Sequence, residues 1–251
     1  MRPFWRYYGG KWAAVSRGLY PAPRHGLIIE PFAGAAGYSC HYWWMDVVLV
    51  ERDPVVAATW RWLLQATPDD VLAIPDIPDG GTVDDIDAPE GARLLAGWWC
   101  NNGAAQPCKT PSAWARASEH SGWGGKVRER IALQVGQIRH WKLIEGHYDQ
   151  APDARACWFV DPPYQTAAGR HYRHHDIDYP ALGRWVEVRS GQVIACDQVG
   201  AEWLRWSGRL DLIGAPGRYR SGKSSEVVYL RGCDEQMPLL EERWKAREGG
   251  R

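Results

Sequence analysis

The 251-residue chain carries 30 basic and 30 acidic residues, so its formal net charge is zero. This length fits one large domain or one domain with an inserted lobe, and 45% hydrophobic residues permit a substantial core. A balanced charge gives no evidence for a polyanionic partner, so any nucleic-acid footprint must be local. No apolar run of about 18 residues and no apolar signal segment occurs, so we expect a cytoplasmic protein without a membrane span.

The six cysteines contain no CxxC pair. Cys157 and Cys196 lie in apolar, strand-like runs, which predicts buried thiols in a reducing compartment. Cys100, Cys108 and the histidine pair at 174–175 match no usual zinc-ligand spacing. We therefore expect no metal site.

Strands alternate with helices along the chain, which predicts an α/β fold with a mostly parallel sheet. In the first part we expect helices over 12–19, from Tyr38 and over 54–65, with strands over 27–30 and 47–50. Residues 67–92 are rich in Pro, Asp and Gly and predict a surface excursion, and residues 98–126 are irregular. The later expected elements are a helix over 127–141 and strands over 142–146, 157–160, 192–196, 210–213 and 227–230.

A loop of small residues, Pro-Phe-Ala-Gly-Ala-Ala-Gly at 31–37, joins the first expected strand to the next helix. It lacks the GxGxxG diphosphate fingerprint, which disfavours NAD. Glu30 precedes this loop and would repel a phosphate, but it suits a cationic ligand with an amine and a sulfonium, such as S-adenosylmethionine; it equally suits a helix cap. Glu51 ends the second strand, where an acid can bond ribose hydroxyls.

Residues 161–164, Asp-Pro-Pro-Tyr, follow the buried strand 157–160, at the strand end where α/β sheets bind ligands. The two prolines fix φ and remove two backbone donors, so a carboxylate and fixed carbonyls form a compact acceptor site beside a tyrosine ring. Such a site suits a planar group with an exocyclic amine. A simple turn is the alternative interpretation.

Four features occur in one order: Tyr-Tyr-Gly-Gly-Lys at 7–11, the segment 30–37, the acidic strand end at Glu51, and residues 161–164. Together they resemble the Dam-type (D12 class, alpha group) DNA adenine-N6 methyltransferases, from about residue 6 to 231 and patchily between 67 and 140. The resemblance implies a Rossmann-like fold, dependent on S-adenosylmethionine, with a small inserted target-recognition lobe. It also implies methyl transfer to adenine N6 of a flipped-out base in double-stranded DNA, with a specific or relaxed target site.

The same resemblance assigns roles to individual residues. It implies a catalytic pocket of Asp161, Pro162, Pro163 and Tyr164. Segment 146–149 departs from the family pattern, because His147 stands where an acid is expected and an acid follows two residues later. The implied cofactor contacts are Tyr7, Lys11, Glu30, Pro31, Phe32, Ala33, Gly34, Gly37, Glu51, Arg52, His147, Tyr148 and Asp161.

Two basic clusters predict phosphate contacts, although either is also typical of a solvated loop. One lies in a loop before the last strand and the other follows residues 161–164. Amide and lysine side chains in the expected recognition region, about 95–140, are candidates for reading base edges. The predicted DNA-binding residues are Asn101, Lys126, Arg170, Arg173, Arg218, Arg220 and Lys223.

We expect a discontinuous catalytic domain (1–94 and 140–235), a target-recognition insertion (95–139) and a charged C-terminal tail (236–251). The protein is expected to act as a monomer or weak dimer in a bacterial or phage-infected cell, in a restriction-modification or phage context. Methylation of cytosine N4 or of adenine in RNA is an alternative, because both substrates present an exocyclic amine that the same acceptor site can bind. A catalytically silent nucleic-acid-binding relative is another.

Overall fold

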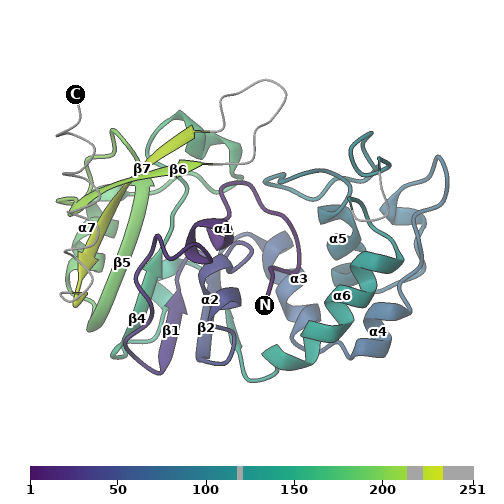
Figure 1. Ribbon diagram of the computed structural model, residues 1–251, viewed down its shortest axis with the longest axis horizontal. Helices are drawn as coiled ribbons and strands as arrows, with labels where there is room; N and C mark the ends of the chain where they lie inside the picture. The colour runs from purple at the N-terminus through teal and green to yellow at the C-terminus, as the bar shows by residue number, and fades with distance from the viewer. Residues whose placement is uncertain (118–120, 214–222, 234–251) are drawn as a thin grey trace.

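The computed structural model describes residues 1–117, 121–213 and 223–233. Seven strands form one sheet in the order β3-β2-β1-β4-β5-β7-β6 (Figure 1). The first five strands in this order are parallel, and β7 pairs antiparallel with both β5 and β6. The strands are β1 (Leu27–Glu30), β2 (Asp46–Glu51), β3 (Lys142–Glu145), β4 (Ala156–Val160), β5 (Gly191–Gln198), β6 (Gly208–Ile213) and β7 (Lys223–Arg231).

The strand order creates one position where ligands are expected. The chain proceeds from β1 to β2 in one direction, and from β4 to β5 in the other, while β1 and β4 lie side by side. This is a topological switch point, and open α/β sheets bind ligands beyond the carboxyl ends of the strands there. The mixed, mostly parallel sheet is consistent with a Rossmann-like fold, and the predicted α/β class is confirmed.

Alternate side chains of the strands enter two hydrophobic clusters on opposite faces of the sheet. Ile28 of β1 packs on the face that carries α1 (Trp12–Val15) and α2 (Gly37–His41), whereas Ile29 packs on the other face with Leu182 of α7 (Tyr179–Glu187). All five residues of β4 are buried, as expected of a strand covered on both sides. The predicted burial of the Cys157 and Cys196 thiols is confirmed.

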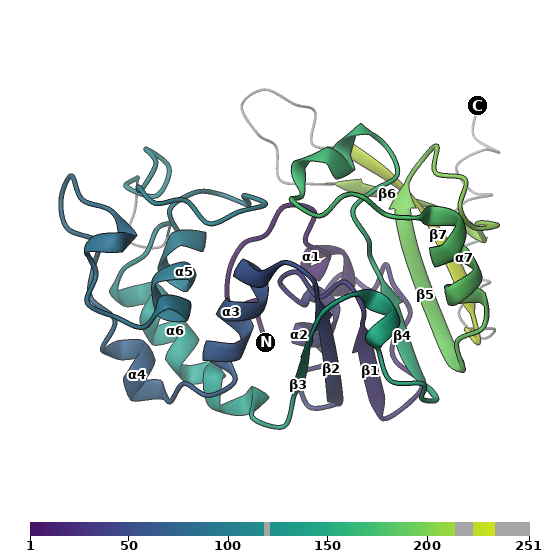
Figure 2. The same ribbon diagram turned by 180° about the vertical axis from the view of Figure 1, so that it is seen from behind.

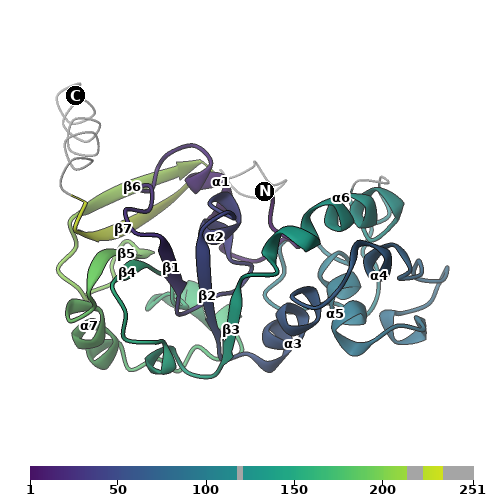
Figure 3. The same cartoon turned by 90° about the horizontal axis from the view of Figure 1, so that it is seen from below.

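Three helices gather beyond the β3 edge of the sheet (Figure 3): α4 (Pro68–Leu72), α5 (Glu90–Trp98) and α6 (Gly125–Val135). Helix α3 (Pro54–Leu63) connects them to the sheet by packing against α5. The expectation that 67–92 is only a surface excursion is wrong, because α4 and the start of α5 lie in it and Ile74, Val83 and Ile86 contribute to a third small core. The proposed insertion boundary at residue 95 falls inside α5.

All seven strand positions agree with the predicted ones to within a few residues, but several helices do not. The helix expected over 12–19 ends at Val15, because Gly18 adopts a left-handed φ of +69° and donates its N–H to the Val15 carbonyl. Helix α7 (Tyr179–Glu187) was not predicted; Asp178 caps it by accepting the Ala181 N–H. It covers one face of the sheet beside β5 (Figure 2).

In the described part of the chain no helix is long and apolar enough to cross a membrane.

Candidate active site

A cleft with about 810 Å³ of empty space, partly open to solvent, lies at the carboxyl ends of β1, β2, β3 and β4. Pro162 is buried and does not line the cleft. Tyr164 does not line it either, but its hydroxyl is bonded to Glu226, which lies 3.7 Å from the cleft residue Lys11. The predicted site residues that line it are Tyr7, Lys11, Glu30, Pro31, Phe32, Ala33, Gly34, Gly37, Glu51, Arg52, His147, Tyr148, Asp161 and Pro163.

The small-residue loop after β1 is held in a strained shape. Gly34 and Ala36 both have φ of +47°, a left-handed conformation that is uncommon for alanine. A Cβ on Gly34 would lie 2.9 Å from the Tyr7 ring. The Trp60 indole donates to the Gly34 carbonyl at 2.7 Å. The loop therefore needs its glycine both for conformation and for the close approach of Tyr7.

Glu51 is fixed by backbone donors at the end of β2. One carboxylate oxygen accepts the Gly34 N–H at 2.9 Å and the other accepts the Asp53 N–H at 2.8 Å. Burial raises the pKa of Glu51 to about 7, although these hydrogen bonds oppose the shift. Each oxygen keeps a lone pair, so Glu51 can still accept a hydroxyl from a ligand.

Glu30 ends β1 in a fully enclosed position. Its carboxylate accepts the N–H of Ser39 in the first turn of α2 at 2.7 Å, so the helix-cap interpretation is confirmed. Burial raises the pKa of Glu30 to about 8, since this bond only partly offsets the lost hydration. The same residue lines the cleft, so a cationic ligand can favour its charged form.

We expect cofactor affinity to rise with pH through the titration of Glu30. Below about pH 8 most Glu30 side chains are protonated and cannot attract a cation; above it they are charged. Between pH 6 and 9, calorimetric titration with S-adenosylmethionine should show a steeper gain in affinity for the native protein than for Glu30→Gln. Comparing the two variants cancels the titration of the ligand's own amine, and parallel pH profiles would contradict the assignment.

The N-terminal segment lies across the cleft because glycines permit close backbone contacts. A Cβ on Gly37 would lie 2.7 Å from the backbone nitrogen of Trp12, and one on Gly9 would lie 2.6 Å from the Tyr172 hydroxyl. Tyr172 also donates to the Tyr8 carbonyl at 2.9 Å. These contacts hold Lys11 over the end of β4.

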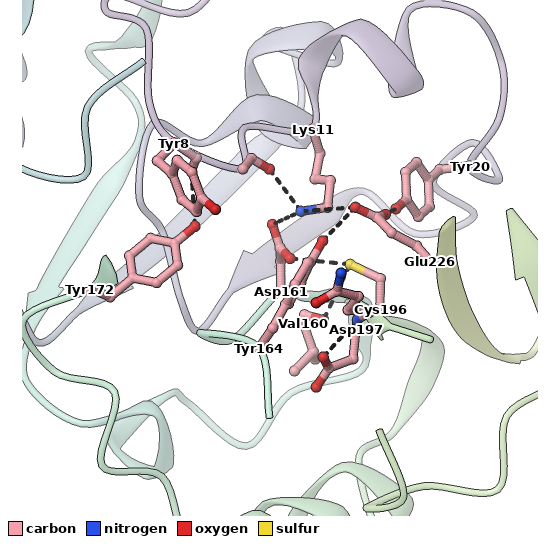
Figure 4. A network of polar contacts seen from close by, with 12 residues as sticks. Tyr8, Lys11, Tyr20, Val160, Asp161, Tyr164, Tyr172, Cys196, Asp197 and Glu226 are labelled. Atoms are coloured by element: carbon pink, nitrogen blue, oxygen red, sulfur yellow. Dashed lines mark hydrogen bonds and ion pairs between the residues drawn. The ribbon is translucent and has the colours of Figure 1, made fainter. Parts of the chain in front are cut away.

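Lys11 is the centre of a buried charge network (Figure 4). Its ammonium donates to Asp161 at 2.7 Å and to the Gly9 carbonyl at 2.8 Å, and lies 3.7 Å from a Glu226 oxygen. Only 4% of the Lys11 side chain is exposed, against 20% for Asp161. Burial alone would lower the pKa of Lys11, but Asp161 and Glu226 outweigh it and raise that pKa well above its usual value. Lys11 therefore stays charged.

Asp161 is held from two sides. Lys11 binds one carboxylate oxygen, and the Cys196 thiol donates to the other at 3.3 Å. Burial raises the pKa of Asp161, opposed by Lys11. The carboxylate keeps a fixed orientation with lone pairs toward the cleft that it lines.

Glu226 is a site residue that the sequence analysis missed. It accepts hydrogen bonds from the Tyr164 and Tyr20 hydroxyls, so Tyr164 is anchored by its hydroxyl (Figure 4). The Tyr164 ring centroid also lies 5.0 Å from the Lys11 ammonium. An isolated glutamate in a late strand carries no motif; only its place on β7, next to β5, brings it to Asp161.

The loop after residue 164 is held in place by Asp197, an acid on β5. Asp197 accepts the N–H of Gln165 and, at 2.6 Å, the indole N–H of Trp203. Burial raises the pKa of Asp197 to about 6. A Cβ on Gly169 would lie 2.0 Å from the Tyr164 carbonyl, so glycine is required where this loop turns back.

Aromatic and imidazole groups form one wall of the cleft, where the segment after β3 meets the loop after β1. The Phe32 and Tyr148 rings lie 5.4 Å apart, and His147 pairs through Nδ1 with Asp149 at 2.9 Å. The acid expected at position 147 is thus present as the partner of His147. In the same cleft, His174 Nε2 is buried and has no hydrogen-bond partner among the described residues.

The structure separates the predicted DNA-binding residues. Asn101, Lys126 and Arg170 are exposed, whereas Arg173 pairs with Asp53 at 3.3 Å and lines the cleft. Arg52, a predicted cofactor contact, forms two hydrogen bonds with Asp176 across the cleft mouth. Arg218 and Arg220 lie outside the described residues, and of Lys223 only the backbone, at the start of β7, is described.

A scan against protein-family models gives no match for this chain, and a search of the curated proteins gives none either. The class of protein is therefore described by its fold and site geometry alone. It is an α/β protein with a cleft at the switch point of its sheet, where such folds bind ligands.

Proposed function

We propose that this protein is an S-adenosylmethionine-dependent DNA adenine-N6 methyltransferase. One observation carries the proposal: the segments 30–37 and 161–164, far apart in sequence, line a single cleft at the switch point between β1 and β4. One segment offers a carboxylate and small-residue loop to a cation. The other offers a fixed acceptor to an exocyclic amine.

The chemistry of the cleft fits the proposed cofactor. Glu30 and Glu51 present carboxylates suited to an ammonium or sulfonium group and to ribose hydroxyls, and Phe32 and Tyr148 present rings suited to a purine. The unpartnered His174 Nε2 adds a polar group whose partner a ligand can supply. When bound, S-adenosylmethionine supplies an electrophilic methyl group on a sulfonium.

The protein's part in the reaction is to hold the amine. Adenine N6 is a poor nucleophile because its lone pair is delocalised into the ring. A hydrogen bond from the amine to Asp161 favours a tetrahedral nitrogen, with its lone pair free for in-line attack. Pro162 does not line the cleft, so its carbonyl is left out of this step. Lys11 and Cys196 keep the Asp161 carboxylate in place, and Tyr164, anchored on Glu226, supports the base. Binding must also offset a few kcal/mol for unstacking the flipped base.

The proposal predicts a specific product. Purified protein incubated with radiolabelled S-adenosylmethionine and mixed-sequence duplex DNA should transfer label to the DNA, and nucleoside digestion should yield N6-methyldeoxyadenosine. RNA of the same sequences serves as the matched substrate control. N4-methyldeoxycytidine or methylated RNA would instead establish one of the alternatives. Cofactor binding without transfer to any nucleic acid would overturn the proposal.

A further inference from the structure

A second groove lies on the opposite side of the N-terminal segment from the cleft. It runs between that segment and α6, where Figure 1 shows the N-terminal chain passing between the sheet and the helical lobe. Its empty space is about 1380 Å³. Four basic side chains and no acidic one line it among the described residues: Arg2, Arg6, Lys126 and Arg130.

The arginines of this groove are held in place by aromatic rings. The guanidinium carbons of Arg6 and Arg130 lie 5.8 Å and 5.2 Å from the centroid of Trp99, and Arg6 also lies 5.0 Å from Trp114. Arg130 donates to the carbonyl of Pro3 at 3.0 Å. Stacked guanidinium groups lose less freedom on binding, so they suit bidentate contact with phosphate. Trp99 itself is buried and offers no face for a base.

The positive charge of the groove is not neutralised within the described protein. None of the four side chains forms an ion pair with an acid in the described ranges, whereas Arg52, Arg61 and Arg128 each do. Glu129, the nearest acid along α6, does not line the groove. Burial, and then the charges of Arg2 and Arg6, lower the pKa of Arg130 to about 10, so the groups repel one another. An anionic ligand would relieve that repulsion.

The groove and the catalytic cleft share a wall. Tyr7, Gly10, Ala35 and Gly37 line both. A chain of phosphates in the groove would therefore pass beside the segment that carries Lys11. In a protein with no net charge, this cluster is the kind of local footprint that nucleic-acid binding needs.

We propose that this groove binds the phosphate backbone of DNA, without reading its sequence, through Arg2, Arg6, Lys126 and Arg130. The choice of DNA among polyanions rests on the proposed function. Three of these residues, Arg2, Arg6 and Arg130, are new to the set of predicted DNA-binding residues. Lys126 was already in that set, but as a candidate for reading base edges, and here it is assigned to a phosphate.

The test is made in the full chain and changes Arg2 and Lys126. Both are exposed, and their side chains form no hydrogen bond or ion pair with the described residues. Arg2→Glu/Lys126→Glu is compared with Lys142→Glu/Arg155→Glu, which makes the same charge change at the opposite end of the sheet. Fluorescence anisotropy with mixed-sequence duplex DNA should show binding weakened about tenfold or more for the groove variant only. The slope of log Kd against log salt should fall by about 2, roughly one for each lost phosphate contact. Calorimetry should show unchanged S-adenosylmethionine affinity.

Equal affinity and salt slope in the two variants would overturn the inference. So would equally tight binding of poly-glutamate, because the groove would then accept any polyanion. Since no methyl transfer is measured, the proposed function can fail independently: DNA binding through the groove with no methylation would leave this inference standing. Methylation with an unaffected groove variant would remove the inference and leave the proposed function.

Discussion

Asp161→Asn is expected to lower the rate of methyl transfer to DNA by about 10³-fold, because a neutral amide stabilises a developing positive charge on the amine far less than a carboxylate does. The substitution is isosteric, and Glu226 still accompanies the Lys11 ammonium at 3.7 Å. Cofactor affinity should change little, since Glu30 and Glu51 provide the other carboxylates of the cleft. Single-turnover kinetics and calorimetry with S-adenosylmethionine measure the two effects separately.

The matched control is Asp46→Asn, an exposed acid at the amino end of β2 and therefore far from the cleft. It should retain the native rate. Urea unfolding of both variants shows that each is folded. An Asp161→Asn variant that turns over at a rate near that of the Asp46 control would remove Asp161 from the reaction, and the proposed function with it.

Lys11→Met is expected to cost about 3–5 kcal/mol of unfolding free energy at pH 8, because it leaves the buried carboxylates of Asp161 and Glu226 without their cation. Methionine fills a similar volume, so lost charge rather than a cavity dominates. The deficit should shrink toward pH 5. Burial raises the pKa of Asp161, and without Lys11 only the Cys196 hydrogen bond opposes that shift, so the carboxyl protonates on acidification and the variant recovers stability.

The double variant Lys11→Met/Glu226→Gln separates electrostatics from packing. Removing one carboxylate together with the cation should restore part of the lost stability at pH 8. Glu226→Gln alone should be destabilising, because Lys11 loses a charged partner and one of the two tyrosines then faces an amide NH2 in place of an acceptor oxygen. Urea titrations at pH 5 and pH 8 measure all three. A Lys11→Met variant as stable as the native protein at pH 8 would show that the network is not a buried ion pair.

The site and the fold differ in how far they could be predicted. Segments 30–37 and 161–164 are local: small residues and prolines restrict the backbone within a few residues, so the sequence shows both the strand end and the loop that follows. All of the predicted contacts in these segments except Pro162 and Tyr164 line one cleft. Glu226 and Cys196 have no such local signature, and they reach Asp161 only through the order of β4, β5 and β7.

Helix prediction failed where a single backbone position or a long-range contact decided the outcome. The helix from Trp12 ends early at the left-handed Gly18, and α7 forms despite Gly183, whose missing Cβ would lie 2.4 Å from the Trp203 carbonyl. Glycine disfavours a helix locally but allows α7 to pack closely. Segment 67–92 was also predicted wrongly. Most of its residues are polar, and the few apolar ones pack with α5 into a third core only in the folded protein.

By itself, then, the amino-acid order determined the α/β class, the strands and the two loops that end β1 and β4, since alternation, proline and glycine act over short distances. Only the tertiary structure decided which charges meet: Lys11 with Asp161 and Glu226, and Arg6 with Arg130 over Trp99. The reason is physical. Strand order and helix packing set distances between residues far apart in the chain, and Coulomb and stacking interactions depend on those distances.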